Sequence, residues 1–198
     1  MIKIIRYLCV VTVSLVSLSA PLRVHGAGEA AQAISVVQGF ADAVSTLHEL
    51  GSPDRERIAI LSGLLGRYID FASTAKRALG PYWTNASVDE RAQFEAGIRD
   101  YLTKNLLMRL VGSTVQSIVV DPPANVLIGE ELLVSARLGA TRGNARQLGF
   151  RLIRSEDGYR IFDVIVSGVS TLELLGAQCK SIIRREGVRA LVVRLAEQ

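Results

Sequence analysis

The chain has 198 residues, of which 49% are apolar and 21% are charged, a balance that favours a packed core over intrinsic disorder. Its 23 Lys and Arg residues against 19 Asp and Glu residues give a net charge of +4. Three of the basic residues lie in the first 26 positions, and the rest of the chain, with 20 basic and 19 acidic residues, has a net charge of +1. Because this charge is small and no basic stripe is evident, we do not expect the protein to bind nucleic acid.

Residues 1–26 have the pattern of a secretory signal peptide. Lys3 and Arg6 form a basic start, an apolar run follows from about residue 7 to residue 20, and small residues lead to a cleavage site before Ala27. The apolar run is shorter than the roughly 20 residues that a membrane span requires, which disfavours the alternative of an uncleaved anchor. We therefore expect export with a cleaved signal peptide, followed by a single domain at 27–198.

The first half of the mature chain has helical periodicity. Apolar residues recur every three or four positions over 31–50 and again over 54–79. We expect the second of these segments to break near Gly66 into two helices and to end at Gly80-Pro81. Ser87 and Glu90 have the spacing of a capping box, which predicts a third helical segment from there to about residue 111.

After Gly112 the apolar period changes to two, which predicts strands. Short polar connections between them indicate antiparallel hairpins. The sequence predicts four strands, at 114–120, 131–140, 146–155 and 159–167. This order of elements indicates an α+β fold, with helices packed on one face of a curved antiparallel four-stranded sheet.

A last helical region begins at Ser170. Glu173 follows Ser170 at the capping-box distance, and the apolar pattern continues to about residue 186. Gly187 is expected to separate this helix from a short closing helix that ends near residue 198.

The residues that most catalytic and metal sites require are scarce. His48 and Cys179 are the only His and Cys of the mature chain, and they lie far apart in the sequence. A metal site would lack ligands, no nucleophile motif is present, and the glycine-rich segments lack the lysine of a phosphate loop. We expect no metal, no cofactor and no enzymatic activity, and we expect Cys179 to be a buried, inert thiol.

Several blocks of sequence resemble the MlaC family, also called the toluene-tolerance or lipid-asymmetry family. The family's run LG-x-x-W-x-x-AS-x-x-x-R-x-x-F is matched by Leu79-Gly80, Trp83, Ala86-Ser87, Arg91 and Phe94, after a similar start at Asp70-Phe71 and Thr74-Ala75. Its YDV-x-x-EGVS block resembles Phe162-Asp163-Val164 and Gly168-Val169-Ser170, and its closing helix resembles Ser181-Ile182-Ile183, Gly187 and 191–195.

The resemblance implies a periplasmic carrier with a cone-like fold and an apolar cavity. The cargo would be a phospholipid, and the partners would be an inner-membrane ABC transporter complex and an outer-membrane lipoprotein complex. The carrier itself is expected to be a monomer. The alternatives are a carrier of hopanoid or another lipid, and an interaction module without cargo.

Candidate lining residues are apolar side chains of the helices and of one strand face. They are Phe71, Leu79, Trp83, Phe94, Ile98, Tyr101, Leu102, Val134, Ala136, Leu138, Leu148, Phe150, Leu152, Phe162 and Val164. For all of them a filled core is the alternative, and for Trp83 it is a structural anchor of the turn at Gly80-Pro81.

Charged residues on the strands could serve the headgroup or a partner. Arg151, Arg154 and Arg160 are candidates for attracting phosphate or an acidic protein, with a solvated outer sheet face as the alternative. Asp163 is expected to accept backbone hydrogen bonds or to pair with an arginine. An acid–base pair of Asp163 with Tyr101, in an enzyme of similar shape, is the other hypothesis.

Overall fold

The computed structural model of the chain describes residues 27–49, 55–110, 115–126, 131–140 and 145–196. The signal-peptide segment, the connection at 51–53 and the polar turn at 141–144 lie outside these ranges. The expectations for those three segments therefore stay predictions.

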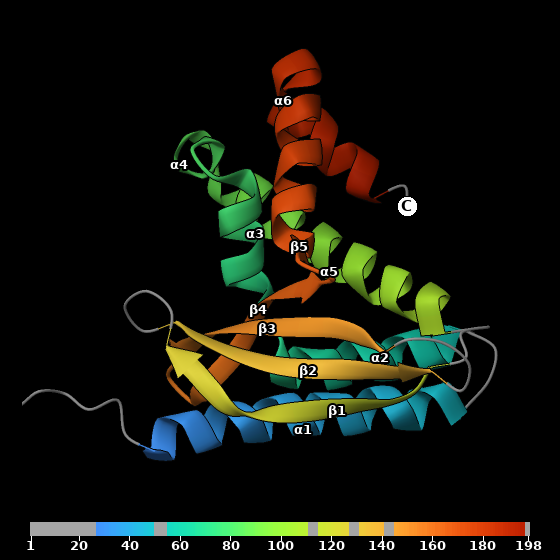
Figure 1. Cartoon of the computed structure of the whole chain (residues 1–198). Helices are drawn as coiled ribbons and strands as arrows, with labels where there is room; N and C mark the ends of the chain where they lie inside the picture. Colours follow the sequence, from blue (N-terminus) through green and yellow to red (C-terminus); the bar gives the residue numbers. More distant parts are fainter. Residues whose placement is uncertain (1–26, 50–54, 111–114, 127–130, 141–144, 197–198) are drawn as a thin grey trace, which may run out of the picture.

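A helical first half leads into an antiparallel sheet, and a long helix closes the chain (Figure 1). The helices are α1 (Ala27–Glu49), α2 (Arg55–Tyr68), α3 (Phe71–Leu79), α4 (Tyr82–Asn85), α5 (Val88–Leu110) and α6 (Thr171–Ala196). The strands are β1 (Val115–Val126), β2 (Leu132–Ala140), β3 (Arg146–Ser155), β4 (Gly158–Val166) and β5 (Val169–Ser170). The order confirms the predicted α+β class.

The sheet has five strands in the order β1-β2-β3-β4-β5, and each neighbouring pair is antiparallel. The predicted count of four was wrong because β5 is only two residues long, too short to show a period of two in the sequence. β5 pairs with β4 because the chain reverses at Ser167 and Gly168, whose φ values are 51° and 84°. β1 also extends to Val126, past its predicted end at Val120.

The predicted break in the second helical segment lies at Ile69-Asp70 rather than near Gly66. Ile69 forms a bridge with Ile161 of β4, and the Asp70 amide donates to the Ile161 carbonyl (2.8 Å). The Asp70 carboxylate then caps α3 by accepting from the Ser73 amide (2.8 Å). The break is set by a tertiary contact with a strand more than ninety residues away in the sequence, and no local glycine signal reveals it.

Two predicted helix signals are confirmed. The Ser87 amide donates to Glu90 (2.9 Å) and the Glu90 amide donates to the Ser87 hydroxyl (3.1 Å), which is the reciprocal pair of a capping box. α6 is kinked at Gly187, whose φ of 85° is a conformation that favours glycine.

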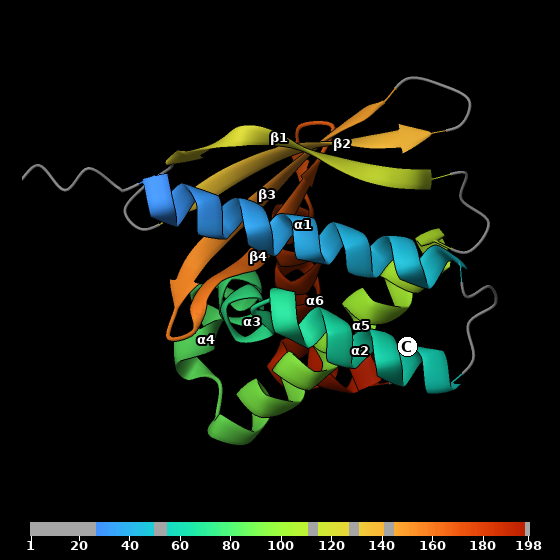
Figure 2. The ribbon, with the colours of Figure 1, turned by 90° about the horizontal axis from the view of Figure 1, so that it is seen from below.

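Buried apolar residues form two clusters. The sheet cluster joins α1, α2 and Phe71 to one face of the sheet, and the helix cluster joins α3, α5, α6 and Phe162. Figures 1 and 2 show α1 lying along the sheet, with α6 rising from the opposite side. Helices therefore pack against both faces near β4, not against one face as the sequence pattern suggested.

A β-bulge in β4 changes which side chains of the strand face the sheet cluster. Arg151 of β3 pairs with Asp163, but the next residue, Leu152, pairs with Ile161, which leaves Phe162 as the extra residue. Ile161 lies in the sheet cluster, whereas Phe162 lies in the helix cluster. The bulge thus reverses the side-chain alternation of β4 at the point where the two clusters meet.

Candidate functional site

The face of the sheet that carries the sheet cluster is packed at one end and partly exposed at the other. Along β2, the exposed fractions of Leu132, Val134 and Ala136 are 2%, 0% and 2%, whereas Leu138 is half-buried. Six half-buried apolar residues that pack against the sheet cluster come from three strands and from α5. We call them the apolar band: Leu102, Ile118, Val120, Leu138, Val164 and Val166.

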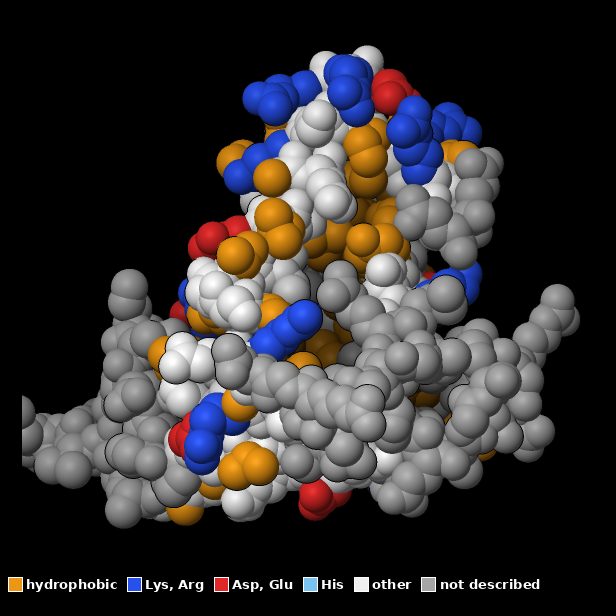
Figure 3. Space-filling model, turned by 45° about the vertical axis from the view of Figure 1, so that its right-hand side comes forward, with side chains coloured by type: hydrophobic (Ala, Val, Ile, Leu, Met, Phe, Trp, Pro, Cys, Tyr) orange, Lys and Arg blue, Asp and Glu red, His pale blue; other side chains and the backbone are white. Residues whose placement is uncertain are grey.

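Strand register places the band residues side by side. Ile118 pairs with Leu138, and Val120 pairs with Ala136. Val166 pairs with Leu148, which continues the same row across the sheet. In Figure 3, apolar side chains lie recessed between the lobe that contains α6 and the layer of the sheet. The strand residues of the band therefore lie on one face of the sheet and keep some exposure, with the buried Ala136 and Leu148 between Val120 and Val166.

The predicted lining residues divide into two groups by burial. Ten are buried in contact with other core side chains: Phe71, Leu79, Phe94, Ile98, Val134, Ala136, Leu148, Phe150, Leu152 and Phe162. Five are half-buried: Trp83, Tyr101, Leu102, Leu138 and Val164. Only the second group offers a ligand surface without rearrangement of the core.

The lining residues also divide between the clusters. Leu79, Phe94, Ile98 and Phe162 lie in the helix cluster, while the buried lining residues of β2 and β3 lie in the sheet cluster. Leu102 of α5 packs against both clusters. Leu102 is therefore a lining residue at which the two clusters meet.

Trp83 has the contacts of an anchor. It packs against the helix cluster, its carbonyl accepts from Arg91 Nε (2.9 Å), and the Arg91 guanidinium lies 5.5 Å from the centre of its ring. These contacts tie α4 to α5.

The three arginines that the sequence suggested for a headgroup or partner all have partners within the chain. Arg151 pairs with Glu131 (3.1 Å), and Arg154 pairs with Glu29 of α1 (2.6 Å). Arg160 donates to the Gly66 carbonyl (2.9 Å). These contacts join the sheet to the surrounding helices and leave the guanidinium groups less available to a phosphate.

Asp163 has the structural role that the sequence predicted for it. Its side chain is 0% exposed and lies 3.5 Å from Arg151, and its carboxylate accepts from the Ser170 hydroxyl (2.7 Å) and the Leu172 amide (2.9 Å). The first turn of α6 is thereby fixed to β4. A carboxylate so enclosed is not free to act with Tyr101 on a substrate, so the geometry gives the acid–base hypothesis no support.

Phe162 and Glu131 hold the helical lobe to the sheet. Two guanidinium groups contact the Phe162 ring, with Arg77 of α3 4.3 Å and Arg151 of β3 4.9 Å from its centre. Both arginines also pair with Glu131, at 2.9 Å and 3.1 Å. Cation–π contacts and a shared carboxylate therefore join α3 to the sheet at the bulge.

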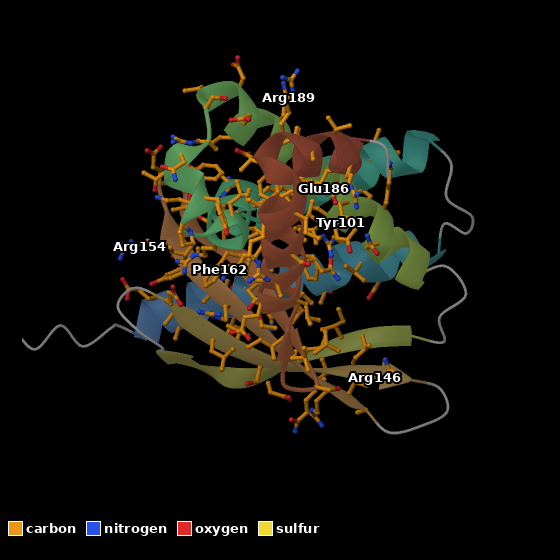
Figure 4. The ribbon with its side chains drawn as sticks, turned by 90° about the horizontal axis from the view of Figure 1, so that it is seen from above. Tyr101, Arg146, Arg154, Phe162, Glu186 and Arg189 are labelled. Carbon is orange, nitrogen blue, oxygen red and sulfur yellow. The ribbon has the colours of Figure 1, made fainter. Side chains whose placement is uncertain are left out.

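Arg146 is a candidate that the sequence reasoning missed. It pairs in register with Leu138 and shares a strand face with Leu148 and Phe150. Its side chain is exposed, and Figure 4 shows it at the end of the sheet remote from Arg189. The signal was available in the alternation of β3, where a cation continues an apolar face.

Other chemistry is sparse in the part of the chain that the structure describes. No group of three or more His, Cys, Asp and Glu side chains is arranged to hold a metal there. Cys179 is buried, and burial raises the pKa of its thiol from 9.0 to about 11, as expected for an unreactive cysteine. Within the same ranges, no helix combines the length and apolar character needed to cross a membrane.

Comparisons with known proteins identify a matching family and a solved structure with a similar fold. The family model described as MlaC protein matches residues 37–197. A solved structure with a similar fold is the phospholipid-binding protein from Ralstonia solanacearum in complex with a phospholipid, with a TM-score of 0.67 and 20% sequence identity over 85% of this chain and 95% of that chain. No protein of curated function matches the sequence significantly.

Proposed function

Because the chain belongs to the MlaC family, we propose that it binds a phospholipid through its acyl chains and carries it across the periplasm. The proposed partners are an inner-membrane ABC transporter complex and an outer-membrane lipoprotein complex. Export with cleavage of residues 1–26 and a single mature domain at 27–198 are parts of the same proposal. No catalytic step is included.

The observation that carries the proposal is the apolar band, in a chain whose family match spans nearly all described residues. A diacyl phospholipid has about 30 methylene groups, each worth about 0.8 kcal/mol when removed from water, or roughly 24 kcal/mol in total before opposing costs. A carrier must therefore enclose nearly the whole of both chains. The band supplies an apolar surface at which an acyl chain can begin to insert.

Full enclosure of two chains requires more room than the band surface provides. Most predicted lining residues, such as Phe94 and Phe150, are buried against other side chains. We infer that the cargo separates the two clusters around Leu102, which packs against both of them. The bound hydrocarbon then replaces contacts that the side chains make with each other in its absence.

Arg146 is the residue that we propose for the phosphate of the headgroup. It extends the apolar face of β3 into solvent beside Leu138, so a lipid with its chains on the band has its phosphate within reach. A guanidinium forms charge-assisted hydrogen bonds with phosphate oxygens. Arg151, Arg154 and Arg160 are proposed as structural residues, since each is already paired.

Native mass spectrometry of the protein exported to a bacterial periplasm and purified without detergent tests the function. A phospholipid released in stoichiometric amount on denaturation is the expected result. A hopanoid in its place would correct the cargo but keep the carrier. Protein that carries no lipid, and takes up none from phospholipid vesicles, would overturn the proposal and leave an interaction module without cargo.

A further inference from the structure

The charges of the mature chain are unevenly distributed. Residues 180–194 of α6 hold five Lys and Arg and one Glu, a net charge of +4. The other residues from 27 onward hold 15 basic and 18 acidic side chains, a net charge of −3. The near-neutral total therefore conceals a basic segment at the end of the molecule farthest from the sheet, where Figure 3 shows Lys and Arg side chains gathered.

Most cations of this segment point into solvent. Lys180, Arg184, Arg185 and Arg189 are all exposed, and they form what we call the basic surface. The single acid of the segment, Glu186, is occupied by Arg194 (2.8 and 3.0 Å). Figure 4 shows Arg189 directed outward from α6. Arg189 also acts on Glu90, whose pKa is lowered mainly by hydrogen bonds with Ser87 and further by this cation.

Helix stability does not explain this arrangement. Lys180 and Arg184 are four residues apart, a spacing at which like charges repel along a helix. Arg189 follows the kink at Gly187 and lies in the first turn of the second part of α6, where the helix dipole disfavours a cation. Arg184 and Arg185, in the last turn before the kink, and Arg194, in the last turn of α6, have favourable positions. The remaining cations indicate an anionic partner.

A shallow hollow beside the basic surface combines guanidinium groups with aliphatic side chains. It is lined by Glu186, Arg189, Ala190, Val193 and Arg194. Val193 is 50% exposed although it is a large apolar residue. Cations interspersed with exposed aliphatic side chains on one helix are typical of surfaces that lie on a lipid headgroup layer.

We propose that the basic surface and this hollow dock the protein on an anionic phospholipid bilayer, with Val193 at the level of the headgroups. The contact is separate from cargo binding, because the apolar band lies on the sheet and α5, whereas the basic surface lies on α6. A bilayer fits better than a nucleic acid or an acidic protein. Single-stranded nucleic acid is bound through stacking on aromatic side chains, whereas the hollow is lined by aliphatic ones. Binding of an acidic protein would not explain why Val193 is exposed.

Co-sedimentation with vesicles tests the proposal. The mature protein is mixed, at low salt, with vesicles of phosphatidylcholine alone or with 30% phosphatidylglycerol. The expected result is binding only to the anionic vesicles, reduced at high salt. Each cation near an anionic bilayer contributes a factor of about five, so the double change Lys180→Gln and Arg189→Gln should weaken binding by about 25-fold. Lys76→Gln with Lys104→Gln removes the same charge from exposed positions elsewhere and serves as the matched control.

The outcomes are distinct from those of the cargo experiment, because vesicle binding is measured whether or not the protein carries lipid. Equal loss in both double variants would show a net-charge effect and overturn the proposal. Equal binding to both vesicle types would also overturn it. If inorganic phosphate competes with vesicle binding better than chloride does at equal ionic strength, the hollow binds free phosphate and the proposal is wrong. If the protein binds no vesicle, the proposal is also wrong, and an acidic protein remains as the partner. Circular dichroism of each variant checks that the fold is intact.

Discussion

Asp163 of β4 accepts a hydrogen bond of 2.7 Å from the hydroxyl of Ser170, the residue that precedes α6. The same hydroxyl accepts from the Glu173 amide (3.0 Å), so the carboxylate, the hydroxyl and the first turn of the helix form a chain of hydrogen bonds. This chain fixes the direction in which α6 leaves the sheet, and with it the position of the basic surface.

Replacing Asp163 by Asn should destabilise the protein by about 2 to 3 kcal/mol. The change removes the charge that faces Arg151 and weakens bonds to the Ser170 hydroxyl and the Leu172 amide, and hydrogen bonds to a charged group are worth roughly that amount. Urea denaturation measures the effect. Asp157→Asn, at a side chain that is 84% exposed, is the control and should stay within about 0.5 kcal/mol. An equally small effect at Asp163 would contradict the capping role.

Gly97→Ala should cost about 1 to 3 kcal/mol. A Cβ at Gly97 would lie 2.8 Å from the Cβ of Leu195, so α5 and α6 would have to move apart. Gly63→Ala in α2 is the matched change, because a Cβ there meets nothing within 4 Å. It should raise stability by about 0.5 to 1 kcal/mol through helix propensity. Thermal or urea unfolding of the pair tests whether the helices are as close as described.

Val120→Trp should reduce the amount of bound phospholipid at least severalfold. Val120 belongs to the apolar band, and an indole ring there would occupy volume that we assign to an acyl chain. Val119→Trp is the control, since the next residue on β1 points to the opposite face and is 48% exposed. Lipid per protein after identical purification is the measurement. Equal lipid in both variants would remove the band from the proposed site.

Arg146→Gln should weaken phospholipid retention by about tenfold, because a charge-assisted hydrogen bond contributes roughly 1.5 kcal/mol. Arg146→Lys should keep part of the retention. Arg137→Gln on β2 is the control: its guanidinium pairs with Asp121 (2.7 Å) at the surface, so its loss should have little effect. Lipid transfer to empty acceptor vesicles measures retention, and equal transfer rates for the two Gln variants would exclude Arg146 as the phosphate contact.

Cys179→Ala should change how stability depends on pH. Burial raises the pKa of the folded thiol from 9.0 to about 11, so the folded state holds its proton over a range in which the unfolded chain loses it. The stability contributed by the thiol is therefore fully present below pH 9 and is lost as the pH rises toward 11. The gap in unfolding free energy between parent and variant should narrow between pH 8 and pH 10.5. A constant gap would show that the thiol is solvated.

Local sequence signals predicted much of the fold. The capping box at Ser87, the kink at Gly187 and three of the strands follow from spacing and period, because caps and strand alternation depend on residues a few positions apart. The predicted hydrogen-bonding role of Asp163 was also correct. β5 was missed, and the helix break at Ile69-Asp70 was predicted near Gly66 instead, since each depends on pairing with β4.

The sequence by itself determined which residues are apolar, where most of the helices and strands lie, and which family the chain resembles. Tertiary structure decided which apolar residues keep an exposed surface: on the apolar face of β2, Leu132, Val134 and Ala136 are buried, whereas Leu138 is half-buried. It also decided that Arg151 is enclosed in ion pairs while Arg146 is exposed. Burial and pairing are set by contacts between distant segments, and no period along the chain encodes them.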